Sequence, residues 1–337
     1  MRRHAQRWVT VIVFALAACS SRASGQSLEG ETTSTTVGET TTSIAVTASS
    51  TTTVTAPAPT TTIVAGPPKV VVTPTGVVLP VLGVEDGGQL HVRTVCGGEA
   101  SYSGAGKRYN RVQVVLDPGH GGFDPGAVQN GIRESDVNLD VALRTRAYLE
   151  RAGIDVVLTR EFDYYVPFVV RGELALNSNA ALFVSIHHNS GRAPLISQPG
   201  TEVYYQQLDA KSRRLAGLLW EDVTAALRVH PIQWYGADDA GALFRQGRTG
   251  PDFYGVLRRT AGVPATLLEI AYLSNPTEAA LVATEAFREE SAAAIAHAIE
   301  RYFNTDDQGA GFSGSRGAGP PTTPTGGTAG CVEPPYE

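Results

Sequence analysis

The sequence predicts an α/β protein, in which a single twisted, mostly parallel sheet carries helices on both faces. Two observations support this fold class. From residue 112 to residue 303, short apolar runs alternate with longer segments of helical periodicity, and this alternation is typical of a sheet covered on both faces. Several polar residues able to do chemistry follow the apolar runs directly, at the strand ends where α/β proteins gather their ligands.

Five short runs rich in β-branched and aliphatic residues predict the strands of this sheet. In chain order they are residues 112–116, 155–159, 181–186, 201–205 and 265–270. The order of the strands within the sheet does not follow from a single sequence.

Three segments have apolar residues at helical spacing. Residues 134–151 place Leu139, Leu143 and Ala147 on one face, and Gly153 follows as a stop signal. Residues 209–227 and 285–303 have an apolar stripe of the same kind. We expect these helices to pack on the sheet and to complete an α/β domain over residues 111–303.

The first 18 residues have the layout of an export signal. Three arginines accompany an apolar stretch from Trp8 to Ala18, which is shorter than the about 20 residues of a membrane-spanning helix. It ends in Leu16-Ala17-Ala18-Cys19, which resembles the lipobox of bacterial lipoproteins. The resemblance implies cleavage before Cys19, a lipid on this cysteine, and an exported protein anchored to the outer face of the cytoplasmic membrane or to the cell envelope. The alternative is an ordinary signal peptide with a chance cysteine.

The segments that flank the α/β domain differ from it in composition. Of the 32 residues from 31 to 62, 19 are Ser or Thr, and such a segment buries too little apolar surface to offset its ordering entropy. Residues 19–69 therefore predict a disordered stalk, and the Gly-, Pro- and Thr-rich residues 304–337 predict a disordered tail. Residues 70–110 predict a small β appendage, with short strands or an edge hairpin at 70–84, a strand at 91–95 and a loop at 101–110.

The cysteines and the net charge bear on environment and partners. If Cys19 carries lipid, Cys96 and Cys331 are left as a pair in an oxidising compartment. A disulfide between them and two free thiols both remain open. The net charge of −6 argues against a nucleic-acid partner, and we expect a monomer.

Polar residues near the strand ends suggest a zinc site. His120 follows the first strand, Glu134 opens the first helix, His187 follows the third strand and Glu269 lies near the end of the last. Two imidazoles and one carboxylate are a common ligand set of catalytic zinc, which keeps a fourth position for water. A further carboxylate can take a proton from that water and pass it to a leaving amine. Taken singly, residues of this kind are more often surface or capping groups.

Four longer motifs extend this interpretation: LDPGHGG, GIRESDVNLDVALRTRAYLERAGIDVVLTREFD, NAALFVSIHHN and TLLEIAYLSNP. In this order and spacing, between residues 112 and 303, they resemble the zinc-dependent N-acetylmuramoyl-L-alanine amidases of the Amidase_3 type, which are peptidoglycan hydrolases. The resemblance implies one zinc ion with His120, Glu134 and His187 as ligands, and Glu269 as the catalytic carboxylate. It also implies hydrolysis of the amide that joins N-acetylmuramic acid to the L-alanine of the stem peptide.

The sequence departs from the family's common pattern at two positions. Ala181 stands where an aspartate is frequent, and His188 stands where a small residue is usual. Strand alternation puts His187 and His188 on opposite sides, and it is the family motif that assigns the metal to His187. No long insertion between Glu134 and His187 is present to form an inhibitory helix, so we expect an open site.

Other residues of the motifs are assigned supporting roles. We assign substrate contacts to His188, Asn189 and Arg248, with Arg245 and Tyr254 as further candidates. For His188, a hydrogen bond that supports the metal site is the alternative. Structural ion pairs are expected of Arg160 and Arg171. Asp117 either supports a histidine ligand or caps its turn.

Two other functions remain open. A different zinc peptidase would cut within the stem peptide. A wall-binding module on the same fold would cut nothing, but the intact set of ligand residues argues against this alternative.

Overall fold

The computed structural model describes residues 66–248, 250–317 and 326–337. The predicted signal peptide, Cys19 and most of the predicted stalk lie outside the described residues. Within the described part of the chain, no helix has both the length and the apolar character needed to cross a membrane.

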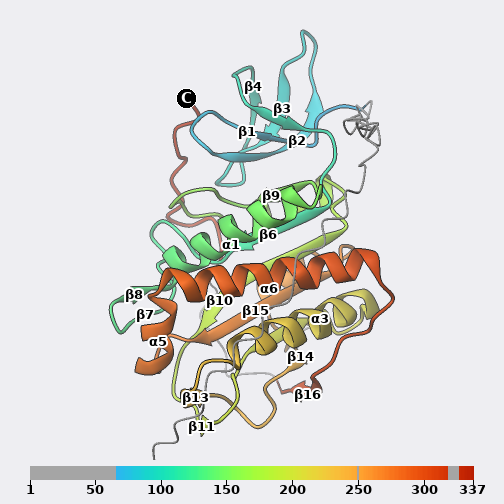
Figure 1. Cartoon of the computed structure of the whole chain (residues 1–337). Coiled ribbons are helices and arrows are strands. Elements are labelled where there is room, and N and C mark those ends of the chain that lie inside the picture. Colours follow the sequence, from blue (N-terminus) through green and yellow to red (C-terminus); the bar gives the residue numbers. More distant parts are fainter. Residues whose placement is uncertain (1–65, 249, 318–325) are drawn as a thin grey trace, which may run out of the picture. The chain divides into compact units, whose positions relative to one another are not determined.

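A seven-stranded sheet forms the centre of the fold (Figure 1), with the strand order β16-β14-β12-β15-β10-β6-β9. Five of its six neighbouring strand pairs are parallel, and the β12–β15 pair is antiparallel. The mostly parallel sheet is therefore confirmed. Its strands are Val114–Pro118 (β6), Val156–Leu158 (β9), Leu182–Asn189 (β10), Glu202–Tyr205 (β12), Ala242–Arg245 (β14), Ala265–Tyr272 (β15) and Phe312–Arg316 (β16).

Helices cover both faces of this sheet, as the sequence predicts. The larger hydrophobic core lies between one face and the three long helices, which are α1 (Glu134–Arg151), α3 (Ala210–Leu227) and α6 (Glu285–Asn304). Residues of the two shorter helices α2 (Phe168–Asn177) and α4 (Gly255–Arg259) pack against the other face. Helix α5 (Pro276–Val282) precedes α6, and two small sheets pair β7 (Val128–Gln129) with β8 (Ile132–Arg133) and β11 (Leu195–Ile196) with β13 (Trp234–Tyr235).

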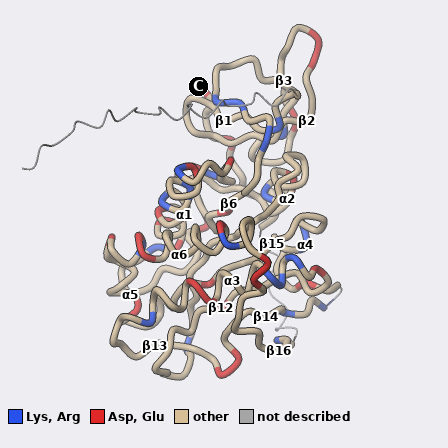
Figure 2. Tube along the Cα trace, turned by 45° about the vertical axis from the view of Figure 1, so that its right-hand side comes forward, with Lys and Arg blue, Asp and Glu red and all other residues tan. Residues whose placement is uncertain are grey.

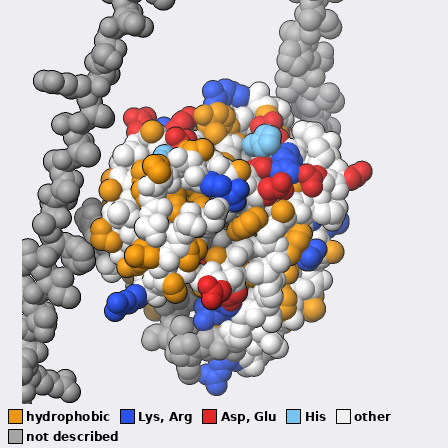
Figure 3. Space-filling view, turned by 60° about the horizontal axis from the view of Figure 1, so that its bottom comes forward, with side chains coloured by type: hydrophobic (Ala, Val, Ile, Leu, Met, Phe, Trp, Pro, Cys, Tyr) orange, Lys and Arg blue, Asp and Glu red, His pale blue; other side chains and the backbone are white. Residues whose placement is uncertain are grey.

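Charged side chains line the outer surface of the long helices. Arg144 of α1 pairs with Glu289 of α6 at 2.7 Å, and Arg288 of α6 pairs with Asp140 of α1. Figure 2 shows residues of both signs along these two helices. On the face in Figure 3, hydrophobic side chains are scattered among Lys, Arg, Asp and Glu side chains. Because exposed ion pairs contribute little to stability, the apolar stripes of the helices hold this layer together.

The β appendage is a five-stranded antiparallel sheet in the order β4-β3-β2-β1-β5. It shares a hydrophobic core with the start of α2, in which Leu79 of β2 belongs to the same cluster as Val166 and Val170. The loop predicted at residues 101–110 is wrong in part, since it contains the end of one strand and the whole of another. The strands are Val70–Val72 (β1), Val78–Val84 (β2), Leu90–Arg93 (β3), Glu99–Tyr102 (β4) and Lys107–Tyr109 (β5).

The prediction of a disordered tail is wrong for the strand β16. This strand pairs with β14 at the edge of the main sheet. Arg213 of α3 lies over the ring of Phe312, 3.7 Å from its centroid, and Arg316 pairs with the buried Glu202 at 2.7 Å. The Gly- and Pro-rich composition favours disorder, but these distant partners order the segment.

A disulfide joins Cys96 to Cys331, 235 positions apart in the chain. It ties the β appendage to the C-terminal residues. Glu333 strengthens this attachment, because its carboxylate accepts hydrogen bonds from the Thr94 hydroxyl and from the Cys96 amide. Of the two states left open by the sequence, the structure has the disulfide.

Candidate active site

The turn after β6 places His120 at the carboxyl end of the sheet. His120 has a φ of 63°, a left-handed conformation that is costly for a residue with a side chain. Two buried arginines stabilise the turn. Arg160 donates to the carbonyl of Gly119 at 3.0 Å, and Arg171 donates to the carbonyl of His120 at 2.8 Å.

Asp117 supports this turn through Arg171 and does not contact a histidine ligand in any described hydrogen bond. Its carboxylate lies 2.5 Å from the Arg171 guanidinium and accepts hydrogen bonds from Thr159 and Ser185. Burial alone would raise the pKa of Asp117, but Arg171 and the two hydroxyls hold it below its ordinary value. The ion pair expected of Arg171 is confirmed, whereas Arg160 donates to backbone carbonyls.

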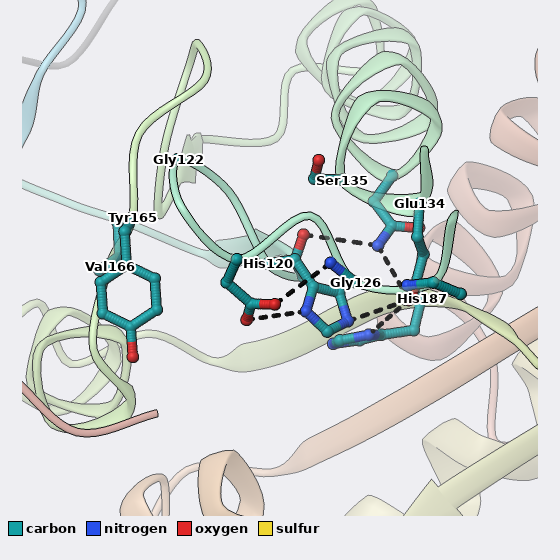
Figure 4. Close-up of polar contacts among 12 residues, drawn as sticks. His120, Gly122, Gly126, Glu134, Ser135, Tyr165, Val166 and His187 are labelled. Atoms are coloured by element: carbon teal, nitrogen blue, oxygen red, sulfur yellow. Dashed lines mark hydrogen bonds and ion pairs between the residues drawn. The ribbon is translucent and has the colours of Figure 1, made fainter. Parts of the chain in front are cut away.

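His120, Glu134 and His187 converge from three different elements (Figure 4). Oε1 of Glu134 lies 3.2 Å from Nε2 of His120 and 3.0 Å from Nδ1 of His187. Their potential ligand atoms all lie within 4.8 Å of one another, and no other group of this kind occurs among the described residues. The structure thus brings together the three residues to which the sequence assigns the metal.

The loop at Gly126 passes close to the Glu134 carboxylate. Oε2 of Glu134 accepts a hydrogen bond from the Ala127 amide at 2.8 Å. Gly126 has a φ of 67°, and a Cβ on it would lie 2.5 Å from Oε2 of Glu134 and 2.6 Å from the His120 ring. Only glycine therefore fits where this loop passes the carboxylate.

The charges of this group favour a cation. Burial opposes ionisation of Glu134, but hydrogen bonds with His120 and His187 outweigh it and hold the pKa of this carboxyl well below its ordinary value. Burial also opposes a charge on His120, yet hydrogen bonds with Asp124 and Glu134 raise its pKa to about 9. A divalent cation would satisfy these carboxylates, and two imidazoles with one carboxylate form a donor set that zinc accepts.

Asp124 is a supporting residue that the sequence did not single out. Its Oδ2 lies 2.9 Å from Nδ1 of His120, and its Oδ1 accepts from the Gly126 amide. Histidines that ligate metals usually donate their second ring N–H to such a carboxylate. The sequence feature that could have identified Asp124 is its position, four residues after His120 in the same glycine-rich loop.

Glu269 lies beside this group because β15 runs between β10 and β12. It is aligned with His187 on one neighbour and with Glu202 on the other. Its Oε2 is buried and has no hydrogen-bond partner among the described residues. Burial, followed by the negative charges of Glu134 and Glu202, raises the pKa of Glu269 well above its ordinary value.

His120, His187 and Glu269 line a cavity of about 270 Å³. A larger cavity of about 460 Å³ elsewhere has no histidine in its lining, so its size does not make it the site of metal chemistry. The lining of the smaller cavity includes the polar residues His120, His187 and Glu269 and the aromatic residues Tyr165, Phe168 and Tyr254.

Glu202 is a second residue that the sequence did not reveal. It is fully buried next to Glu269 and accepts hydrogen bonds from Tyr204 at 2.7 Å and from Asn189 at 3.2 Å. Arg316 neutralises it at 2.7 Å. A glutamate inside an otherwise apolar strand was the available signal, because a buried charge requires a partner.

The structure does not support the substrate contact assigned to His188, because this residue is buried and does not line the cavity. Its side chain is buried on the opposite side of the strand from His187, and its Nδ1 lies 2.8 Å from Oδ1 of Asn138 on α1. Its Nε2 is buried without a partner among the described residues. Burial lowers the pKa of His188 to about 4, so the folded protein holds this ring neutral.

The neutral state of His188 predicts a loss of stability in acid. Its folded-state pKa of about 4 lies below the ordinary value of about 6.5, so the unfolded chain takes up the proton first as the pH falls. We expect stability to fall by about 2 kcal/mol between pH 7 and pH 5 from this residue. In urea unfolding with excess chelator, His188→Gln should lose correspondingly less than the wild type, and equal losses would contradict this origin.

The other predicted substrate contacts are only partly gathered at the cavity. Tyr254 lines it. Asn189 is tied to Glu202 behind the cavity. Arg248 is exposed and is not among the residues that line the cavity, while the guanidinium of Arg245 lies 4.0 Å from the centroid of the Phe253 ring.

These side chains gather at the strand ends of an α/β sheet. This arrangement of fold and site is that of an α/β enzyme. Residues 114–301 match the family model described as N-acetylmuramoyl-L-alanine amidase. The chain therefore belongs to the N-acetylmuramoyl-L-alanine amidase family, of the Amidase_3 type, as the motifs predict.

Individual relatives agree with this family. The chain is 32% identical over 232 residues to the amidase AmiC of Neisseria meningitidis, covering 60% of this chain and 55% of AmiC. It thus spans about half the length of that relative. It is 31% identical over 227 residues to AmiA of Escherichia coli, covering 58% of this chain and 77% of AmiA. Among solved structures, an N-acetylmuramoyl-L-alanine amidase from Clostridium difficile is 27% identical, with a TM-score of 0.48 over 58% of this chain and 99% of its own.

Proposed function

We propose that this protein hydrolyses the amide bond between N-acetylmuramic acid and the L-alanine of the peptidoglycan stem peptide, with one zinc ion held by His120, Glu134 and His187. The observation that carries the proposal is a buried carboxylate shared by two imidazoles, next to a second carboxylate that has a free, buried oxygen. Bound zinc supplies Lewis-acid polarisation of the carbonyl and a water that ionises near neutral pH.

Glu269 performs the proton transfers in this proposal. Its Oε2 faces no competing donor among the described residues, so it is available to accept the proton of the attacking water. The raised pKa of this carboxyl lets it hold that proton and deliver it to the nitrogen of the departing L-alanine. Tyr165, Phe168 and Tyr254 provide aromatic surface in the same cavity.

The proposed location follows from the sequence of the first 19 residues. An export signal that ends in Cys19 would place the protein outside the cytoplasmic membrane, held by a lipid on this cysteine. The folded domain would then reach the peptidoglycan on the Ser/Thr-rich stalk. Its role would be cell-wall remodelling or turnover.

The proposed function is tested by incubating the purified protein with peptidoglycan fragments, with and without a metal chelator. We expect free stem peptides that begin with L-alanine, identified by mass spectrometry, only in the sample without chelator. A cut within the stem peptide would instead show a zinc peptidase. No cleavage in either sample would show a wall-binding module.

Replacing Asp124 with asparagine should weaken zinc binding by about 10–100-fold, because such supporting partners orient the ligating histidine and raise its basicity. The measurement is a competition titration of zinc against a chromophoric chelator. Asp136→Asn is the matched control, since Asp136 is an exposed residue near the start of α1 that pairs with Arg133. An affinity equal to that of the control would contradict the supporting role.

A further inference from the structure

Residues 326–331 form a segment that we call the C-terminal strap. It connects Tyr165 and Phe168, which line the cavity, to the β appendage. At one end, the carbonyl of Gly326 accepts a hydrogen bond from the amide of Phe168 at 2.9 Å. At the other end, Cys331 is bonded to Cys96. The strap and Cys96 both lie outside residues 114–301, which match the amidase family.

The strap completes the first turn of α2. The residue before this helix is Pro167, which provides no side-chain hydrogen bond to cap it. The first amides of a helix lack partners within the helix, and the Gly326 carbonyl supplies one to Phe168. The strap therefore helps to fix the helix that carries Arg171, which in turn donates to the carbonyl of His120.

The strap also holds two aromatic side chains that line the cavity. The hydroxyl of Tyr165 donates to the Gly327 carbonyl at 2.8 Å. Phe168 packs directly on Gly326, where a Cβ would lie 2.1 Å from Cδ2 of the ring. Gly326 also has a φ of 79°, so both its conformation and the space at this contact suit glycine.

Tyr165 and Phe168 line the same cavity as His120 and His187. Figure 4 shows Tyr165 across the site from Glu134 and His187. A carbonyl placed at the three proposed ligands would occupy the cavity that Tyr165 and Phe168 line. The groups on either side of the scissile amide would then lie against these rings.

We propose that the C-terminal strap determines substrate affinity by fixing Tyr165 and Phe168 as a preordered wall for the part of the peptidoglycan substrate next to the scissile amide. The proposal rests on the proposed amidase function. Preordering a binding surface strengthens binding because less side-chain freedom is lost in the complex. Disturbing the strap should therefore raise KM more than it lowers kcat.

The test compares Gly326→Ala with Gly314→Ala, an exposed glycine outside the strap, in the full chain. A Cβ on Gly326 would collide with Phe168, whereas a Cβ on Gly314 meets no atom within 4 Å. Cys331→Ser is a second variant, which frees the far end of the strap without touching the cavity. Dissociation constants for a purified disaccharide-peptide fragment of peptidoglycan are measured in the Glu269→Gln background, together with zinc content, and KM and kcat in the active background.

We expect Gly326→Ala and Cys331→Ser to weaken binding by about tenfold, with zinc content unchanged, KM raised and kcat nearly constant. Gly314→Ala should bind as the parent does. Unchanged affinity in both strap variants would overturn the proposal, and so would a loss of zinc in them, which would show a general structural role. If the wild type releases no stem peptide, the amidase function fails, but the dissociation constants still decide the role of the strap.

Discussion

Replacing Glu269 with glutamine should leave zinc bound and lower kcat for amide hydrolysis by about 10²–10⁴-fold. The three proposed ligands are untouched by this change, because Glu269 comes from β15 and is not part of their group. Glutamine has nearly the same shape but cannot accept a proton at neutral pH. The variant should therefore separate metal binding from proton transfer.

Zinc content by elemental analysis and the rate of stem-peptide release are measured on the same samples. Glu150→Gln provides a matched control, because Glu150 is exposed at the end of α1. A Glu269→Gln variant that loses zinc would identify Glu269 as a ligand. A variant that keeps nearly full activity would remove it from the proposed proton transfers.

The sequence predicts the proposed metal ligands well because each of them is recognisable from its neighbours in the chain. His120 and His187 each stand at the end of an apolar run, and the ends of parallel strands meet at one edge of a sheet. The motifs add what periodicity cannot, namely the roles of these residues and of Glu269, whereas the order of the strands comes from the structure. The structure then places the residues within reach of one another.

The supporting residues could not be predicted because their partners are distant in the chain. Glu202 is acceptable inside the protein only because Arg316 reaches it from a glycine-rich segment. Neither the amino-acid composition nor the hydrophobic periodicity around Arg316 predicts that this residue lies in a strand. His188 is a similar case, since its burial depends on Asn138 of a packed helix.

Helix α2 was missed for a different reason. It has only ten residues, and Val169 and Val170 near its start are β-branched, which favours strands. Its stability comes from packing on both sides. Leu174 and Ala175 belong to the core on the face of the main sheet opposite the long helices, while Val170 joins the core of the β appendage. Tertiary contacts therefore override the local preference.

Replacing Arg171 with methionine should lower the free energy of unfolding by about 3–5 kcal/mol, the cost of leaving one partner of a buried ion pair uncompensated. Arg171 and Asp117 are 2% and 1% exposed and lie 2.5 Å apart. The same change removes donors from the carbonyls of Pro118 and His120. Because the left-handed turn at His120 depends on these donors, zinc affinity should fall together with stability.

Two further variants separate the charge from the turn. Adding Asp117→Asn to Arg171→Met removes the unpaired charge, so it should recover part of the lost stability but not the zinc affinity. Arg111→Met is the control, since Arg111 pairs with Asp155 at 3.8 Å with both side chains about half exposed, and such pairs contribute little. Denaturant unfolding gives the stabilities. Equal losses for Arg171→Met and Arg111→Met would mean that the buried pair does not hold the turn, and the support of His120 would then rest on Arg160 alone.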